Sequence, residues 1–180
     1  MLAMECMHLP SPSHSVQHVY HDRGAPIARR FEGAPSVLCG PVTRIMSRTV
    51  TCAHPALAVE VISELLVRER VGCIPVVDKC GRPVGVITNR DLVEQLLVVV
   101  PVGGDSPTTA SLLPRTAIEL MVPDFVTVAQ DATVELAATV MTRECVHHLG
   151  VVDADGRLIG VVSTTDIVRS LSASAPRPSP

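Results

Sequence analysis

Two stretches of the chain repeat the same order of apolar and polar positions. Each begins with a short strand, predicted at about 50–53 and at 126–129, and continues into a helix. Helical spacing is carried in the first stretch by Ile62, Leu65, Leu66 and Glu69, and in the second by Leu136, Ala137, Val140 and Met141. One face of each helix is therefore predicted to lie in a core.

Each helix is followed by two short apolar runs that are rich in Val and Ile. The first runs are CIPVVD and HLGVVD, and the turns KCGRP and ADGR separate them from VGVIT and IGVVS. Runs of this length around Gly-containing turns are typical of β-hairpins. A final helix is expected over 89–98 in one copy and 164–171 in the other. The sequence thus predicts an α/β (α+β) fold in which a β-α-β-β-α unit occurs twice.

The two units match each other in register. A shift of 75 residues places Met46 on Met121, Val76 on Val151 and Asp91 on Asp166. Near the start of each unit, VTCAHPA at 50–56 matches VTVAQDA at 126–132 only at a shift of 76. We therefore expect an internal duplication with a one-residue change in the loop before the first helix.

The flanking segments differ in composition from the repeats. We expect a disordered, His- and Pro-rich tail over 1–41, a first repeat over 42–100 and a Pro-, Gly- and Ser/Thr-rich linker over 101–115. A second repeat is expected over 116–171, and a second disordered tail over 172–180.

Composition excludes several partners. The chain has no Trp, only 2% aromatic residues and a net charge of -3, which argues against nucleic acid as a main partner. No apolar run reaches 18 residues and no export signal is evident, so we expect no membrane span and a cytoplasmic location. The six scattered cysteines are expected to be free thiols, with Cys73 and Cys145 buried.

The candidate chemistry lies in a repeated heptad, GVITNRD at 85–91 and GVVSTTD at 160–166. Thr88 with Asp91, and Ser163 with Asp166, have the spacing of a helix-capping box. The same corner also suits a ligand, because a helix N-terminus attracts phosphate, the hydroxyl can donate to it, and the Asp can accept from ribose hydroxyls. Arg90 adds a cation to the first corner, whereas Thr165 adds none to the second. The first corner is therefore the better candidate for phosphate.

The repeats resemble a tandem pair of CBS domains, a Bateman module. The resemblance rests on the openings IMSRTVTC and LMVPDFVTV, on IPVVD and LGVVD before a turn, and on G-x-x-[Thr/Ser]-x-x-Asp at the close of each repeat. It implies repeats packed through their strands about a pseudo-twofold axis, with two clefts for AMP, ADP, ATP or S-adenosylmethionine. It also implies a homodimer.

The resemblance further implies where the adenine base lies. In one cleft the base would lie against Cys73, Ile74 and Pro75, and in the other against His148, Leu149 and Gly150. Gly150 stands where the first repeat has Pro75, so we expect a looser chain beside the second base site.

These features predict a non-catalytic sensor that signals to an unknown partner protein and requires no cofactor. No nucleophile–base pair, P-loop or dinucleotide-binding turn indicates an enzyme. The alternative is a ligand-free scaffold that dimerises. No metal site is predicted, because His147 and His148 are expected to point to opposite faces. A zinc or nickel site remains an alternative in the tail, with the candidate ligands Cys6, His8, His14, His18 and His21.

Overall fold

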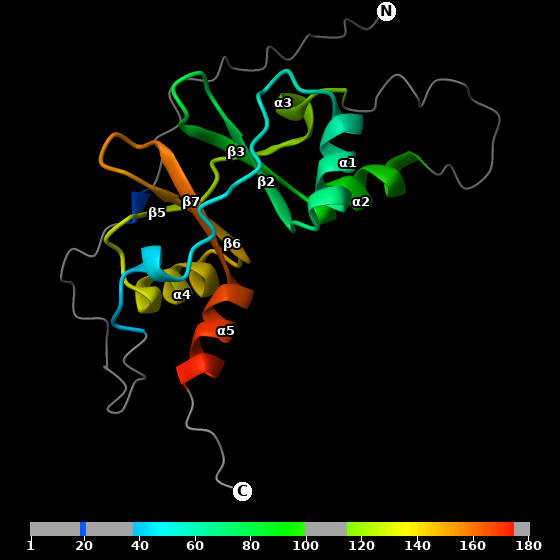
Figure 1. The fold of residues 1–180 in the computed structure, drawn as a ribbon. Helices are drawn as coiled ribbons and strands as arrows, with labels where there is room; N and C mark the ends of the chain where they lie inside the picture. The colour runs from blue at the N-terminus through cyan, green and yellow to red at the C-terminus, as the bar shows by residue number, and fades with distance from the viewer. Residues whose placement is uncertain (1–18, 21–37, 100–114, 175–180) are drawn as a thin grey trace, which may run out of the picture.

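The computed structural model describes residues 19–20, 38–99 and 115–174. Within these residues the chain forms two halves, each a small sheet with helices packed on it (Figure 1). The elements of the first half are α1 (Val59–Glu69), β2 (Cys73–Val77), β3 (Pro83–Thr88) and α2 (Asn89–Val99). Those of the second half are β5 (Thr127–Ala129), α4 (Val134–Arg143), β6 (His148–Val152), β7 (Leu158–Ser163) and α5 (Thr164–Ser174).

The hairpins and the helices around them confirm the predicted duplication. β2 pairs with β3 and β6 pairs with β7, both antiparallel and in equivalent register. Gly81 and Gly156 lie at the turns with φ of 79° and 76°, a left-handed conformation that glycine adopts without strain. The predicted apolar face of the first helix in each repeat is buried, at Ile62 and Leu66 in α1 and at Ala137, Val140 and Met141 in α4.

The short segments at the start of each repeat, before its first long helix, pack on the opposite half. The 3-10 helix η1 (Val42–Arg44) places Val42 and Met46 in the core of the second half. The helix α3 (Ala117–Leu120) and the strand β4 (Val122–Pro123) lie on the first half, where Ala117 and Leu120 join the core and β4 pairs with β3. The two halves are therefore interlocked by exchanged segments.

Backbone hydrogen bonds reveal the symmetry of this exchange. Val42 N donates to Ala132 O over 2.7 Å, and Ala117 N donates to Leu57 O over 2.8 Å. Both donors and both acceptors are related by 75 residues. Ala53 pairs with Val76 as Val128 pairs with Val151, which keeps the same shift. The predicted slip to 76 is therefore wrong, and the local match of VTCAHPA with VTVAQDA does not reflect equivalent positions.

Three other expectations differ from the structure. No strand forms over 50–53, where Ala53 makes only a single bridge to β2. The segment 1–41 contains ordered residues, because β1 (Val19–Tyr20) pairs with β5 and Pro41 bridges to Thr133. The remainder of that tail up to residue 37, most of the linker and residues 175–180 lie outside the described residues. Cys145 is exposed at the end of α4, whereas Cys73 is buried as expected.

Candidate functional site

Both heptad corners form helix caps. Asp91 Oδ2 accepts from the backbone N and the Oγ1 of Thr88, over 2.6 and 2.7 Å. Asp166 Oδ2 accepts in the same way from the backbone N and the Oγ of Ser163, over 2.9 and 2.6 Å. At the second corner, Asp166 N also donates to Ser163 Oγ over 3.2 Å, which completes the capping box. The predicted capping box is therefore complete at the second corner, whereas at the first corner the Asp91 carboxylate supplies its half of the box.

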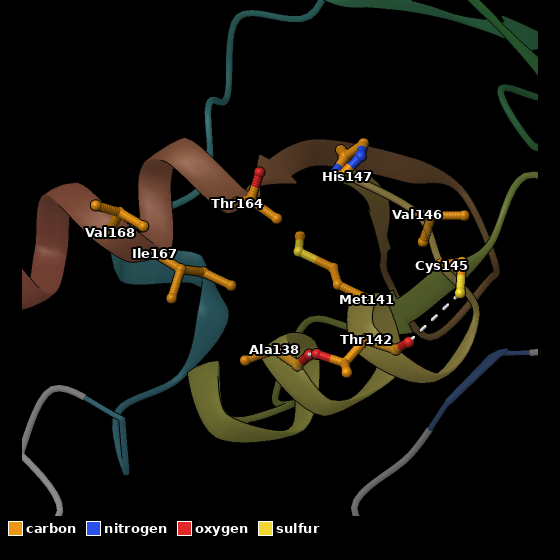
Figure 2. A pocket seen from close by; sticks show the side chains of 9 residues that line it. All are labelled: Ala138, Met141, Thr142, Cys145, Val146, His147, Thr164, Ile167 and Val168. Atoms are coloured by element: carbon orange, nitrogen blue, oxygen red, sulfur yellow. Dashed lines mark hydrogen bonds between the residues drawn. The ribbon is translucent and has the colours of Figure 1, made fainter.

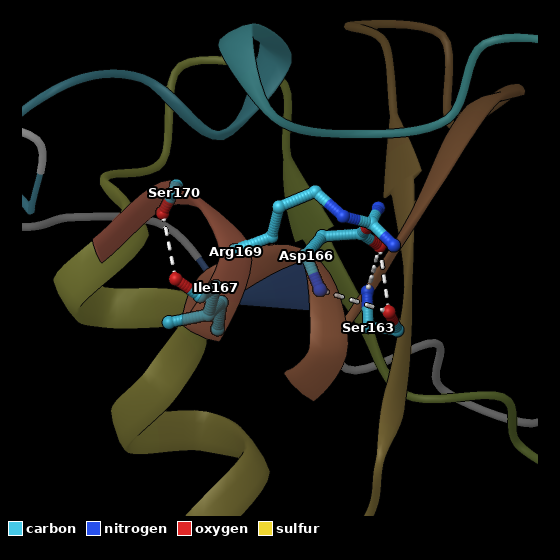
Figure 3. A network of polar contacts seen from close by, with 5 residues as sticks. All are labelled: Ser163, Asp166, Ile167, Arg169 and Ser170. Carbon is cyan, nitrogen blue, oxygen red and sulfur yellow. Dashed lines mark hydrogen bonds and ion pairs between the residues drawn. The ribbon is translucent and has the colours of Figure 1, made fainter. Parts of the chain in front are cut away.

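Capping occupies only one oxygen of Asp166. Its Oδ1 lies 3.4 Å from a guanidinium nitrogen of Arg169, one turn further along α5, as Figure 3 shows. The Arg169 side chain is 75% exposed, whereas that of Asp166 is 16% exposed. Because a solvated arginine at this distance holds the carboxylate weakly, Oδ1 is the part of the corner that a ligand hydroxyl can reach.

A pocket of about 240 Å³ opens beside Asp166 and lies between the two halves. One wall comes from the second half and includes the predicted residues His148, Ser163, Thr165 and Asp166. The first half and the exchanged segment supply the opposite wall, with the residues Ser47, Thr49, Val50, Thr51, Arg70, Val71, Gly72 and Cys73. Val161 and Arg169 complete the lining.

The structure places Cys73 and His148 in this one pocket, although they were assigned to separate clefts. The ring of His148 lies over the backbone of Gly72, where an added Cβ would be 2.9 Å from His148 Nε2. Burial and the neighbouring His147 lower the pKa of His148. Burial raises the pKa of the Cys73 thiol to about 12, so this cysteine is an apolar wall and a poor nucleophile.

The remaining predicted base-contact residues are buried. Ile74 and Leu149 are 0% exposed and belong to the cores of their own halves, so their side chains point away from a cleft. Pro75 is buried in β2. Ile74 and Leu149 therefore offer no side chain to a base. Pro75 has no backbone N–H, and its carbonyl oxygen already accepts from Ala53 N over 2.9 Å.

Gly150 is tightly packed, contrary to the expected loose chain. It is buried in β6 and pairs with strands on both sides, at Thr127 and Val161. An added Cβ would lie 3.0 Å from side-chain atoms of Leu158, Phe125 and Thr127. The glycine therefore provides the space for the ring of Phe125.

The first corner has a different electrostatic environment from the second. Arg90 forms an ion pair with Glu94 over 2.6 Å, and its side chain is 84% exposed. This pairing raises the pKa of Arg90. Glu94 is equivalent to Arg169, so an acid stands in the first half where the second has a base. The preference for the first corner rested on Arg90 and on a loose chain at Gly150. The structure supports neither argument, because Arg90 is paired with Glu94 and Gly150 is tightly packed.

A second pocket of about 470 Å³ lies between α4 and α5, on the outer side of the second half (Figure 2). Its lining is mostly apolar and includes Met141, Val146, Ile167 and Val168. His147 lines this pocket while His148 lines the other, so the two histidines face different surfaces as predicted.

The described part of the chain offers neither a metal site nor a helix that could span a membrane. No group of three or more His, Cys, Asp and Glu residues there could hold a metal ion. No helix within those residues is both long and apolar enough to cross a bilayer. The histidines of the tail that were considered as zinc or nickel ligands lie outside these residues.

Comparison with known proteins identifies the fold. The model of the CBS domain matches residues 42–98 and again residues 117–173. The chain belongs to the CBS domain family. The family predicted from the sequence is thereby confirmed, and the two matches coincide with the two copies of the duplication.

Several curated relatives match most of the chain. An uncharacterized protein of Methanopyrus kandleri is 30% identical over 134 residues, 74% of this chain and 62% of that protein. The chloroplast CBS domain-containing protein CBSX2 of Arabidopsis thaliana is 28% identical, over 64% of this chain and 56% of its own length. An L-aspartate semialdehyde sulfurtransferase of Methanocaldococcus jannaschii is 26% identical over 71% of this chain. The chain spans 22% to 62% of the length of these three relatives.

Solved CBS domain pairs share the arrangement of both repeats. The crystal structure of CBSX2 in complex with AMP has a TM-score of 0.65 at 26% identity, over 76% of this chain and 99% of that one. The CBS domain pair of protein MJ0100, in complex with 5′-methylthioadenosine and S-adenosyl-L-methionine, has a TM-score of 0.61 at 26% identity. That match covers 73% of this chain and 98% of the other. The predicted fold class is confirmed.

Sequence reasoning missed nine of the fourteen residues that line the pocket. Arg70, Arg169 and the hydroxyl residues Ser47, Thr49 and Thr51 lie outside the heptad. Arg70 follows α1 in a left-handed conformation with φ of 53°, which no local pattern indicated. These hydroxyls lie on the segment that follows η1, whose position depends on contacts with the second half, such as the bridge from Ser47 to Val161. Only Arg169 had a local signal, because it lies three residues after Asp166 on the same helix.

Proposed function

We propose that the chain is a non-catalytic regulatory module that binds an adenosine-containing ligand in the pocket beside Asp166. The observation that carries this proposal is the open pocket at a capped carboxylate whose Oδ1 faces only the exposed Arg169. Asp166 would accept from ribose hydroxyls, while Ser163 and Thr165 lie at the helix N-terminus that attracts phosphate. The binding of a second ligand at Thr88, Arg90 and Asp91 in the first half remains a prediction.

The ligands of structural relatives support this class of molecule. CBSX2 was solved with AMP, and the pair of MJ0100 with 5′-methylthioadenosine and S-adenosyl-L-methionine. All three compounds contain adenosine. We extend this common feature to the present chain and propose no resident cofactor beyond that ligand.

The position of the pocket supports a regulatory role. Its walls come from both halves and from the exchanged segment around Ser47, which pairs with Val161. A ligand there would hold the two halves in one arrangement, and a partner protein would bind that arrangement preferentially. The effect on the partner is limited by the ligand's difference in affinity for the two states.

We propose that a second copy of this chain binds the exposed surface formed by α2 and α5. Val67, Val93 and Val168 are 78%, 53% and 61% exposed, and Val168 borders the apolar pocket of Figure 2. Val93 and Val168 are equivalent positions, so both halves present an apolar helix that a symmetric dimer can cover. Light scattering should give a dimer mass for the wild type and a monomer mass for Val168→Asp. Val61→Asp, also on a helix surface, is the control, and a monomeric wild type contradicts the dimer.

Thiol chemistry supports a cytoplasmic location. The five described cysteines are free, and four of them are exposed. Exposed free thiols persist in a reducing compartment.

A ligand screen tests the proposed function. The melting temperature of the whole chain would be measured with AMP, ADP, ATP, GTP, adenosine and S-adenosylmethionine. We expect the adenosine compounds to raise it, because a ligand that binds only the folded state stabilises that state. A flat response across all six compounds, together with a dimer mass, would favour the ligand-free scaffold instead.

A further inference from the structure

We infer that the pocket beside Asp166 selects phosphorylated adenosine ligands over the cationic S-adenosylmethionine, and that Arg70 and Arg169 make this selection. The inference rests on the proposed function, since it concerns the same pocket. The inference specifies the charge of the ligand. The heptad does not determine that charge, and the relatives were solved with ligands of different charge.

Two arginines reach this pocket from opposite halves. Arg70 follows α1 in the first half, and Arg169 lies on α5 in the second. Asp166 is the one carboxylate in the lining, and its charge is already shared among Ser163 N, Ser163 Oγ and Arg169. The lining therefore carries two arginines against one carboxylate, with Arg169 in weak contact with that carboxylate and Arg70 in addition, and this net positive charge attracts an anion.

The first half shows that the fold does not require this charge. The residues at the positions equivalent to Arg70 and Arg169 are Cys145 and Glu94, and Asp124 is equivalent to the pocket residue Thr49. Arg90, the one arginine of the first corner, is paired with Glu94 over 2.6 Å. Among the described residues, this positive charge is therefore found only around the second corner, although both corners have a carboxylate cap of the same kind.

The ligands differ in the charge that they bring to these arginines. A phosphate monoester carries a charge of about -1.5 to -2 near pH 7. The sulfonium of S-adenosylmethionine is positive at the equivalent end of the molecule, and adenosine has no charge. Hydroxyls of Thr49, Thr51 and Thr165 line the same pocket and can donate to phosphate oxygens. The pocket should therefore bind AMP more tightly than adenosine, and S-adenosylmethionine least.

Titration calorimetry on the full chain tests this order with adenosine, AMP, ATP and S-adenosylmethionine. The variants are Arg70→Gln and Arg169→Gln, and the control is Arg68→Gln, whose side chain pairs with Glu64 and Glu69. Each of the two variants should lower the affinity for AMP roughly three- to tenfold and leave that for adenosine unchanged. Added salt should weaken AMP binding more than adenosine binding. Arg68→Gln should change neither affinity.

The outcomes separate this inference from the proposed function. Binding of AMP above adenosine, with loss of that preference in the two variants, supports the inference. Binding of adenosine as tightly as AMP, or of S-adenosylmethionine more tightly than AMP, overturns it and leaves the proposed function intact. An AMP affinity that both variants leave unchanged overturns it as well. Absence of binding by every compound overturns both.

Discussion

In both halves a carboxylate at the start of a helix accepts from the hydroxyl and the N–H of the residue three positions before it, with almost the same geometry. Around Asp166 a pocket lies between the halves and has arginines in its lining. Around Asp91, an acid and an arginine neutralise each other on the exposed face of α2. The heptad thus specifies a helix cap in both halves, while residues far from it in the sequence determine the charge and shape of the surface around that cap.

Making the second corner resemble the first at one position should weaken ligand binding more than any other change. Val50 lines the pocket, and the equivalent residue in the second half is Phe125. Val50→Phe should place a ring in the pocket and weaken AMP binding at least about a hundredfold, or ~2.7 kcal/mol. Calorimetry measures this, with Val61→Phe on the surface of α1 as the control. Unchanged affinity would show that the ligand binds elsewhere.

The exchanged segments should be equally important in both halves. An added Cβ would lie 2.5 Å from Met121 Sδ at Gly85 and 2.5 Å from Met46 Sδ at Gly160. Gly85→Ala and Gly160→Ala should each lower the free energy of unfolding by about 1–3 kcal/mol, since both overpack a junction between halves. Urea unfolding measures the two changes. Gly81→Ala serves for comparison. It should lower the free energy of unfolding only through its positive φ, because no atom lies close to the added Cβ. A large effect in only one half would contradict the symmetric exchange.

Helix capping is a smaller difference between the halves. Thr133 Oγ1 accepts from Leu136 N over 3.1 Å at the start of α4, whereas Ala58 at the start of α1 has no capping side chain. Thr133→Ala should lower the free energy of unfolding by about 1 kcal/mol, and Ala58→Ser should raise it by a few tenths to about 1 kcal/mol. Thermal unfolding measures both. Thr133→Ser is the control that retains the cap, and an equal loss in it would contradict the assignment.

The smallest effect concerns pH. The folded state lowers the pKa of His148, so the unfolded state binds more protons in the range just below the ordinary histidine pKa of about 6.5. The contribution of His148 to stability is therefore present above that pKa and is lost as the pH falls towards the folded pKa. His148→Gln should flatten the fall in unfolding free energy between about pH 7 and 5. His147→Gln should retain more of this pH dependence of the unfolding free energy than His148→Gln does. An equal pH dependence in the wild type and in His148→Gln would contradict this account.

The duplication and its elements could be predicted because their signals are local. Strand alternation, Gly-containing turns and helical spacing lie within each repeat, and they place β2, β3, β6 and β7 correctly. The exchanged segments could not be predicted, because Val42 and Ala117 owe their positions to partners far along the chain. The packing role of Gly150 was missed for the same reason, since Phe125 approaches it from the segment between β4 and β5.

For the candidate site, the sequence identified the corner but not its surroundings. Ser163, Thr165, Asp166, His148 and Cys73 do line one pocket. The side chains of Ile74 and Leu149 lie in the cores instead. This could not be predicted, because the sequence of a strand does not reveal which of its faces meets the other half. The charge of the pocket depends on Arg70, which reaches it only through the packing of the two repeats.

The most direct test of the central claim is calorimetric titration of AMP into the wild type, Asp166→Asn and Asp91→Asn. We predict that Asp166→Asn lowers the affinity about ten- to a hundredfold, since it removes a charge-assisted acceptor from the open pocket. Asp91→Asn should leave that affinity within about twofold, with circular dichroism confirming that both variants fold. An affinity that is lost in Asp91→Asn and retained in Asp166→Asn would contradict the account.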